Sequence, residues 1–147
     1  MEEQTSPDAS PTAVATPTIE IKNQQGQVIH TVEGTTLAGA DLYKVNLAGA
    51  DFSGQTLTRT KFYGCNLEGS TFEGADCFKA DFQIANLTGA NCRKANLMWA
   101  NMLSTDLSGA DLTDAQVDWV HWKGTRYSAQ TKFPKGFKTD AHEFVKR

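Results

Sequence analysis

The residues of this sequence that are best suited to chemistry are its histidines, its cysteines and its acidic side chains. The three histidines are far apart and have no paired nucleophile at a useful spacing: His30, His121 and His142. The three cysteines are an odd number for a disulfide framework and lack zinc-ligand spacing: Cys65, Cys77 and Cys92. The glycines never form the G-x-x-x-x-G-K sequence of a phosphate-binding loop. We therefore expect no catalytic residues, no metal and no cofactor.

The acidic residues belong to a regular pattern. Residues 35–119 divide into seventeen five-residue units with no insertion and no proline. The first position is Ala ten times, the second Asp or Asn twelve times, the third Leu or Phe thirteen times and the fifth Gly eight times. This period matches neither a helix nor a long strand, so the chain must change direction every five residues. The regular spacing explains the acidic residues without acid–base catalysis.

Four such units close a square coil of twenty residues, and successive coils stack at about 4.8 Å, the spacing of neighbouring strands. The first and third side chains of each unit then point inward, and fifth-position glycine suits a turn with positive φ. The cysteines fall at inward positions and are expected to act as small core residues. The predicted structural core is the third-position column: Leu37, Leu42, Leu47, Phe52, Leu57, Phe62, Leu67, Phe72, Cys77, Phe82, Leu87, Cys92, Leu97, Met102, Leu107, Leu112 and Val117.

These units resemble the pentapeptide-repeat family, whose pattern is A-[D/N]-L-x-x, and the resemblance covers all of residues 35–119. It implies an all-β fold, namely a right-handed quadrilateral β-helix, which is a solenoid of about four coils here. Members of the family share this scaffold more than they share an activity. The best-known members protect DNA gyrase by imitating the shape and charge of DNA.

Together with the repeats, the sequences that flank them divide the chain into four predicted segments. Residues 1–17 contain three prolines and little to bury, and we expect a disordered leader. Residues 18–34 alternate apolar and polar side chains around an Asn-Gln-Gln-Gly turn, which predicts a β-hairpin that caps the solenoid of residues 35–119. Residues 120–147 form a C-terminal cap and tail, in which Trp122 and Tyr127 cover the open end. The capping-box spacing of Asp140 and Glu143 predicts a short terminal helix.

Large apolar residues occupy the outward positions of two adjacent faces only. The first face carries the units that begin at residues 35, 55, 75, 95 and 115, and the second face carries the units that follow them. We call these residues the aromatic patch, a candidate interaction surface: Tyr43, Tyr63, Phe78, Ile84, Met98, Trp99, Leu103 and Trp119. Two interpretations stay open. Either the tail folds back over the patch, chiefly over its Trp99/Trp119 end, or the patch binds another protein or a second copy. The tail residues that would cover it are Phe133, Phe137, Phe144 and Val145.

The charged residues at outward positions are less clearly segregated by face than the large apolar residues are. Residues 120–147 carry seven basic and two acidic residues, whereas the third and fourth faces each sum to −2. Their acidic residues form a candidate acidic surface: Asp51, Glu68, Glu73, Asp106, Asp111 and Asp114. This surface supports an alternative function as a DNA mimic that modulates a type II topoisomerase such as gyrase. A long and continuous acidic side is absent, and the basic pair Arg93 and Lys94 interrupts the fourth face.

The composition limits the kinds of partner and the cellular compartment that we expect for this chain. The net charge of −3 is too small to imply nucleic acid or an anionic membrane as an obligatory partner. The sequence has no apolar run of transmembrane length, and its acidic first residues lack the apolar region of a signal peptide. We expect a cytoplasmic, non-catalytic scaffold or protein-interaction module that acts on an unidentified protein partner or on itself, without a small-molecule substrate.

Overall fold

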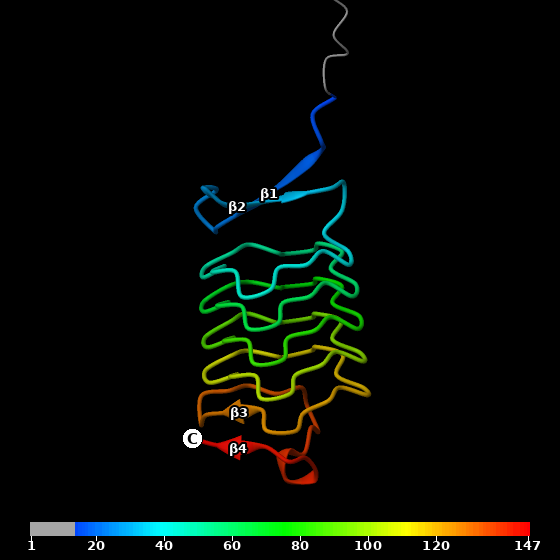
Figure 1. Ribbon diagram of the computed structural model, residues 1–147. Coiled ribbons are helices and arrows are strands. Elements are labelled where there is room, and N and C mark those ends of the chain that lie inside the picture. Colours follow the sequence, from blue (N-terminus) through cyan, green and yellow to red (C-terminus); the bar gives the residue numbers. More distant parts are fainter. Residues whose placement is uncertain (1–13) are drawn as a thin grey trace, which may run out of the picture.

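The computed structural model describes residues 14–147. The expected disordered leader, residues 1–17, lies for the most part outside this range. The described chain contains short strands, isolated bridges and turns, with one 3-10 helix of three residues. None of it forms a helix that is long and apolar enough to cross a membrane. Figure 1 shows successive turns of the chain stacked along one axis, with the two ends of the described chain at opposite ends of the stack.

Parallel bridges hold the stack together, and they join residues that are twenty apart in the sequence. The series runs from Asp41↔Lys61 to Asp106↔Arg126, and every residue that these parallel bridges join within 41–121 is the second of its five-residue unit. We call each layer of the stack a rung. Backbone hydrogen bonds join one rung to the next, such as Leu87 N–H to Asp106 O at 2.8 Å. One turn of the chain therefore takes four units.

The turns between units use a left-handed residue at the fifth position of every unit. Eight of these residues are glycine, as expected, and nine are not. The second residue supports the turn, because its side-chain oxygen accepts a hydrogen bond from the backbone N–H two residues later. Asp81 Oδ1 accepts from Gln83 at 3.0 Å and Asn86 Oδ1 from Thr88 at 2.9 Å. The Asp and Asn side chains of the second column therefore stabilise the turns.

The interior is filled by the third-position side chains. Sixteen of the seventeen are buried, and the exception is Val117, which is half-buried. The sequence prediction placed Val117 in the core with the others, but no further strand of residues 14–147 covers its unit. Phenylalanine rings pack through the centre, with Phe52 on Phe72 and Phe62 on Phe82, each pair with ring centroids 5.0 Å apart. Edge contacts between the two pairs complete an aromatic column.

Polar residues at the inward first position satisfy their hydrogen bonds inside the stack. Thr60 Oγ1 donates to Leu37 O at 2.7 Å, and Thr105 Oγ1 donates to Phe82 O at 2.7 Å. Each bond reaches a carbonyl twenty-three residues earlier, one rung along the stack. These threonines are fully buried, so the bonds replace the water that the hydroxyls lose.

Two strands precede the stack, β1 (Thr18–Lys22) and β2 (Val28–Glu33), and they pair antiparallel with Ile21 opposite His30. The turn between them is held by Asn23, whose Oδ1 accepts from the backbone N–H of Gln25 and of Gln27. The pair contacts the first turn of the stack, since Asp51 N–H donates to Lys22 O at 2.8 Å.

The C-terminal segment ends with β3 (Arg126–Tyr127) and β4 (Val145–Lys146), which pair in parallel, and η1 (Thr139–Ala141) lies between them. The helix expected from the Asp140–Glu143 spacing is wrong. The 3-10 helix begins before Asp140, ends before Glu143 and has no side-chain cap. Glu143 instead pairs with Lys123, with Oε2 and Nζ 3.4 Å apart.

Candidate functional site

The cysteines lie inside the stack as free, buried thiols. Burial raises the pKa of Cys65 to about 11 and that of Cys92 to about 12, and it raises the pKa of Cys77 well above its usual range. Cys65 Sγ also donates to Leu42 O at 2.8 Å. Because the thiolate is the reactive form, these three thiols are poor nucleophiles and poor metal ligands.

The three histidines lie in different parts of the described structure: His30 in β2, His121 on the second face and His142 directly after η1. His142 stacks on Phe137, with ring centroids 5.1 Å apart, and His121 is exposed. Within residues 14–147, no group of three or more His, Cys, Asp or Glu side chains is arranged to hold a metal ion. His142 therefore packs against the tail aromatics, and His121 lies at the surface.

The candidate acidic surface carries less free charge than the sequence suggests. Asp106 Oδ2 lies 3.2 Å from Arg147 Nη1, and Asp111 Oδ2 lies 3.2 Å from Arg93 Nη1. Three of the six carboxylates also support turns, because Asp51, Asp106 and Asp111 each accept from the backbone N–H two residues later. Glu68, Glu73 and Asp114 are exposed.

Asp106 and Asp111 should make the stability of the protein depend on pH. Burial alone would raise both pKa values, but hydrogen bonds from Ser108 to Asp106 and from Thr113 to Asp111, together with nearby arginines, lower them. A lowered pKa contributes stability that is present above the unfolded value, about 3.9, and that is lost as the pH falls through the folded value. The double variant Asp106→Asn/Asp111→Asn should have a free energy of unfolding about 1 kcal/mol lower than that of the wild type at neutral pH.

Below about pH 4 this difference should shrink, because the wild-type carboxylates become protonated. Urea denaturation of the wild type and of Asp106→Asn/Asp111→Asn across this pH range measures it. Asn keeps the side-chain oxygen that accepts the turn hydrogen bond, so the comparison isolates the charge. A difference that is the same at acidic and neutral pH would contradict the assignment.

The aromatic patch is partly exposed to solvent, and four of its eight residues form two stacked pairs. Tyr43 stacks on Tyr63 at 5.2 Å between centroids, and Trp99 stacks on Trp119 at 5.5 Å. Four members are exposed by 44–69 %: Tyr43 55 %, Ile84 44 %, Trp99 45 % and Trp119 69 %. The other four are half-buried: Tyr63, Phe78, Met98 and Leu103. Each pair joins residues twenty apart, so the bridge ladder itself brings the rings together.

The tail does not cover this patch, and the interpretation that tail side chains pack over its Trp99/Trp119 end is wrong. Phe137 and Phe144 pack instead on Trp122, with ring centroids 5.4 and 5.3 Å away. Phe133 and Phe144 pack on Tyr127 in the same cluster. Val145 is exposed in β4. The tail aromatics contact the end of the stack because the large Trp122 ring presents the apolar surface that they bury.

The tryptophans of the patch occupy unfavourable backbone positions. Trp99 has φ 61° and Trp119 has φ 62°, while Ile84 on the neighbouring face has φ 52°. The left-handed region costs about 1–2 kcal/mol for a residue other than glycine. Stacking of the two indoles returns about 0.5–1.5 kcal/mol, so the fold gains little from this pair. The sequence signal for this feature was present, because bulky residues stand in the column that most often holds glycine.

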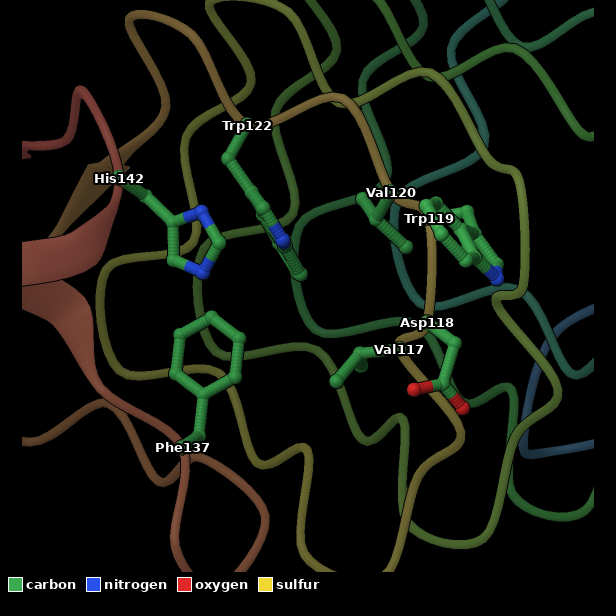
Figure 2. Close-up of a pocket in the computed structure, with 7 residues that line it drawn as sticks. All are labelled: Val117, Asp118, Trp119, Val120, Trp122, Phe137 and His142. Carbon is green, nitrogen blue, oxygen red and sulfur yellow. The ribbon is translucent and has the colours of Figure 1, made fainter.

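One feature was missed by sequence reasoning, an open cavity of about 420 Å³ at the C-terminal end of the first face. Figure 2 shows Phe137 and His142 on one side of it, Asp118 and Trp119 on the other, and Val117 and Val120 between them. Its lining residues are Val117, Asp118, Trp119, Val120, Trp122, Phe137 and His142. Two of these come from the tail, whose path does not follow the five-residue pattern.

The twenty-residue ladder and its five-residue units define a β-solenoid of short repeats. The family profile described as "Pentapeptide repeats (8 copies)" matches residues 35–74 and 75–115. The chain therefore belongs to the pentapeptide-repeat family. No curated protein matches the sequence.

Solved structures show the same fold. The pentapeptide repeat protein Rfr23 from the cyanobacterium Cyanothece 51142 is 31% identical, with a TM-score of 0.63 and 63% of each chain covered. HetL from Nostoc sp. strain PCC 7120, a protein involved in heterocyst differentiation regulation, is 23% identical, with a TM-score of 0.50 over 62% of this chain and 46% of its own. The chain thus spans less than two thirds of either relative.

QnrB1, a plasmid-mediated fluoroquinolone resistance protein, is more distant. It is 14% identical, with a TM-score of 0.40 over 86% of this chain and 71% of its own. A similarity this low shows nothing about the function of this chain.

Proposed function

We propose that this chain is a non-catalytic interaction module that presents the aromatic patch to a protein partner or to a second copy of itself. The observation that carries the proposal is the exposed Trp99–Trp119 stack at two left-handed positions. Glycine would relieve the backbone at both positions, so the fold alone gives little reason for tryptophan there. Exposed aromatic side chains of this size are typical of binding surfaces.

The surroundings of the stack suit a protein contact. A second hollow of about 360 Å³ lies beside it, lined by Trp99, Asn101, Leu103 and His121. A hollow next to a rigid aromatic pair can accept an apolar side chain from a partner, and such sites usually contribute most of the binding energy of an interface. Lys79 Nζ lies 5.4 Å from the ring centroid of Phe78, and Lys44 Nζ lies 5.1 Å from that of Tyr43, which adds positive charge at the edge of the aromatic patch.

The test is the double variant Trp99→Gly/Trp119→Gly. We expect its free energy of unfolding to stay within about 1 kcal/mol of the wild type, because the relief of backbone strain at two positions is offset by the lost stacking and by the conformational entropy that two glycines lose on folding. Association should weaken by about 30-fold or more, which corresponds to the loss of one hot spot of about 2 kcal/mol. Sedimentation measures self-association, and comparative affinity purification from the native cell measures partner recovery.

The matched control is Lys94→Gly/Asp114→Gly. These residues stand in the same fifth-position column, twenty residues apart on the fourth face, with φ 58° and 61°, so the control relieves the same backbone strain without changing the aromatic patch. Unchanged self-association and unchanged partner recovery in the tryptophan variant would overturn the proposal.

The alternative function, a DNA mimic acting on a type II topoisomerase, has weaker support. Asp106 and Asp111 are paired with arginines, and Arg93 and Lys94 interrupt the acidic surface. A gyrase supercoiling assay with the purified protein separates the two functions. Inhibition that survives loss of the tryptophans but not loss of the exposed Glu68 and Glu73 would favour the DNA mimic.

We further propose a quadrilateral solenoid over residues 35–119, with caps formed by residues 18–34 and 120–147. The N-terminal cap is supported by Gln24, whose Nε2 donates to Gly69 O at 2.8 Å and so reaches the second rung. The C-terminal cap is supported by the cluster around Trp122, which is buried. A cytoplasmic location fits the three free thiols.

A further inference from the structure

The first face ends in an open edge. One rung earlier, Leu97 N–H donates to Gln116 O at 2.8 Å, Trp99 N–H donates to Asp118 O at 3.1 Å, and Ala95 O accepts from Gln116 N–H at 2.9 Å. The corresponding groups of the last unit are Val117 N–H, Trp119 N–H and Ala115 O. None of these three groups has a backbone partner within residues 14–147. We call residues 115–120 the open edge.

The other faces end differently, because the tail supplies strands or single contacts there. On the third face β4 pairs with β3, with Arg126 opposite Val145. On the fourth face Lys132 bridges Asp111, and its carbonyl accepts from Leu112 N–H at 2.7 Å. On the second face Gly124 N–H donates to Glu143 O at 2.8 Å. The tail thus passes the first face without adding a rung to it.

The cavity described above lies against the open edge. Its lining includes Val117, Asp118, Trp119 and Val120 from the edge, together with Phe137 and His142 from the tail. Figure 2 shows Val117 and Val120 between the tail residues on one side and Asp118 and Trp119 on the other. Three backbone groups without backbone partners thus lie beside a cavity, which is the arrangement expected where a sheet lacks its next strand. Sheet edges of this kind bind extended peptides through their main chain.

We propose that the open edge binds an extended peptide of a partner protein as one more parallel rung. The hydrogen-bond pattern between successive rungs fixes the register of the peptide on the edge. The peptide carbonyls accept from Val117 N–H and Trp119 N–H, and one peptide N–H donates to Ala115 O. This site goes beyond the aromatic patch, because it uses the end of the stack and its main chain, although Trp119 borders both.

The same ladder specifies the side chains of the peptide. Residues one rung apart lie over each other, as Trp99 and Trp119 do at 5.5 Å. The central peptide residue therefore lies over the half-buried Val117 and points at Trp122 and Phe137, which favours Leu, Ile or Met. The next residue lies over Asp118. Asp118 is exposed and makes no salt bridge within residues 14–147, so a lysine or arginine complements it.

The test uses two blocked pentapeptides with the sequences Ala-Asn-Leu-Lys-Gly and Ala-Asn-Leu-Glu-Gly, titrated to millimolar concentration into the full chain. Amide NMR resonances of Val117 and Trp119 report hydrogen bonding at the edge. We expect the lysine peptide to shift both resonances and to bind about 3- to 10-fold more tightly than the glutamate peptide at low salt. In Asp118→Lys the preference should reverse.

Two controls separate strand addition from simple apolar contact. A lysine peptide methylated on the backbone nitrogen of its Asn cannot donate to Ala115 O, and its affinity should fall about tenfold. Trp99→Gly should leave peptide affinity unchanged while it weakens association through the aromatic patch, so failure of one proposal is distinguishable from failure of the other. Equal binding of the methylated peptide would overturn the strand. The proposal would also be overturned if the Val117 and Trp119 resonances shifted only with protein concentration, because the edge would then bind a second copy of the chain.

Discussion

Leu87→Lys is expected to prevent the chain from folding. Leu87 is fully buried in the middle of the stack, where the residues one rung away in its column, Leu67 and Leu107, are also fully buried. An ammonium group there would have no anionic partner, and burial of an unpaired charge costs several kcal/mol. That cost is comparable with the 5–15 kcal/mol of stability that a domain has in total. Far-UV circular dichroism and urea denaturation would measure the loss.

The matched control is Thr88→Lys, because Thr88 is the next residue and stands at an outward, half-exposed position. Its free energy of unfolding should change by less than about 0.5 kcal/mol. A soluble Leu87→Lys protein with a cooperative unfolding transition would contradict the inward position of the third column. The pair of variants therefore tests the register of the repeat at two adjacent residues.

Phe72→Ala is expected to have the second-largest effect, a loss of about 3–5 kcal/mol in the free energy of unfolding. The Phe72 ring contacts three others in the interior, with centroids 5.0 Å from Phe52, 5.6 Å from Phe62 and 5.5 Å from Phe82. Its removal would leave a cavity that the closed stack of rungs cannot fill by collapse, because the backbone ladder fixes the spacing of the rungs.

Phe72→Leu is the control for this variant, since it keeps most of the volume and should cost less than about 1.5 kcal/mol. Phe78→Ala, at a half-buried outward position, controls for the loss of an aromatic ring as such. Guanidinium denaturation of the three variants gives the comparison. A loss below about 1 kcal/mol for Phe72→Ala would show that the aromatic column contributes little.

The repeat could be predicted from the sequence because its positions have different steric needs. A large residue at the third position excludes one at the first, and glycine at the fifth relieves a left-handed turn, so the columns are visible without a structure. The family match confirms this part. The sequence did not show that residues such as Lys44 and Asp114 would also adopt positive φ. The neighbouring rungs impose that conformation, and intrinsic preference for glycine does not prevent it.

The tail could not be predicted in the same way. Its direction depends on which apolar surface Phe137 and Phe144 reach first, and the large Trp122 ring decides this through contacts far apart in the sequence. The Asp140–Glu143 spacing favours a helix locally, but β4 and the Lys123–Glu143 pair take over that segment. The open edge follows from the same path, since a strand that pairs with β3 cannot also cover the first face.

The twenty-residue ladder has a consequence for how the gene can change length. Gain or loss of a whole coil leaves every downstream side chain on its own face, so Trp99 and Trp119 could be separated by one rung without leaving the first face. Gain or loss of one unit keeps the core columns but moves everything downstream to the next side. Removal of five residues between the two tryptophans would place Trp119 over Lys94 instead of Trp99, and the stack would be lost while the solenoid remained. Duplication of coils therefore preserves a binding side, and duplication of single units creates a new one.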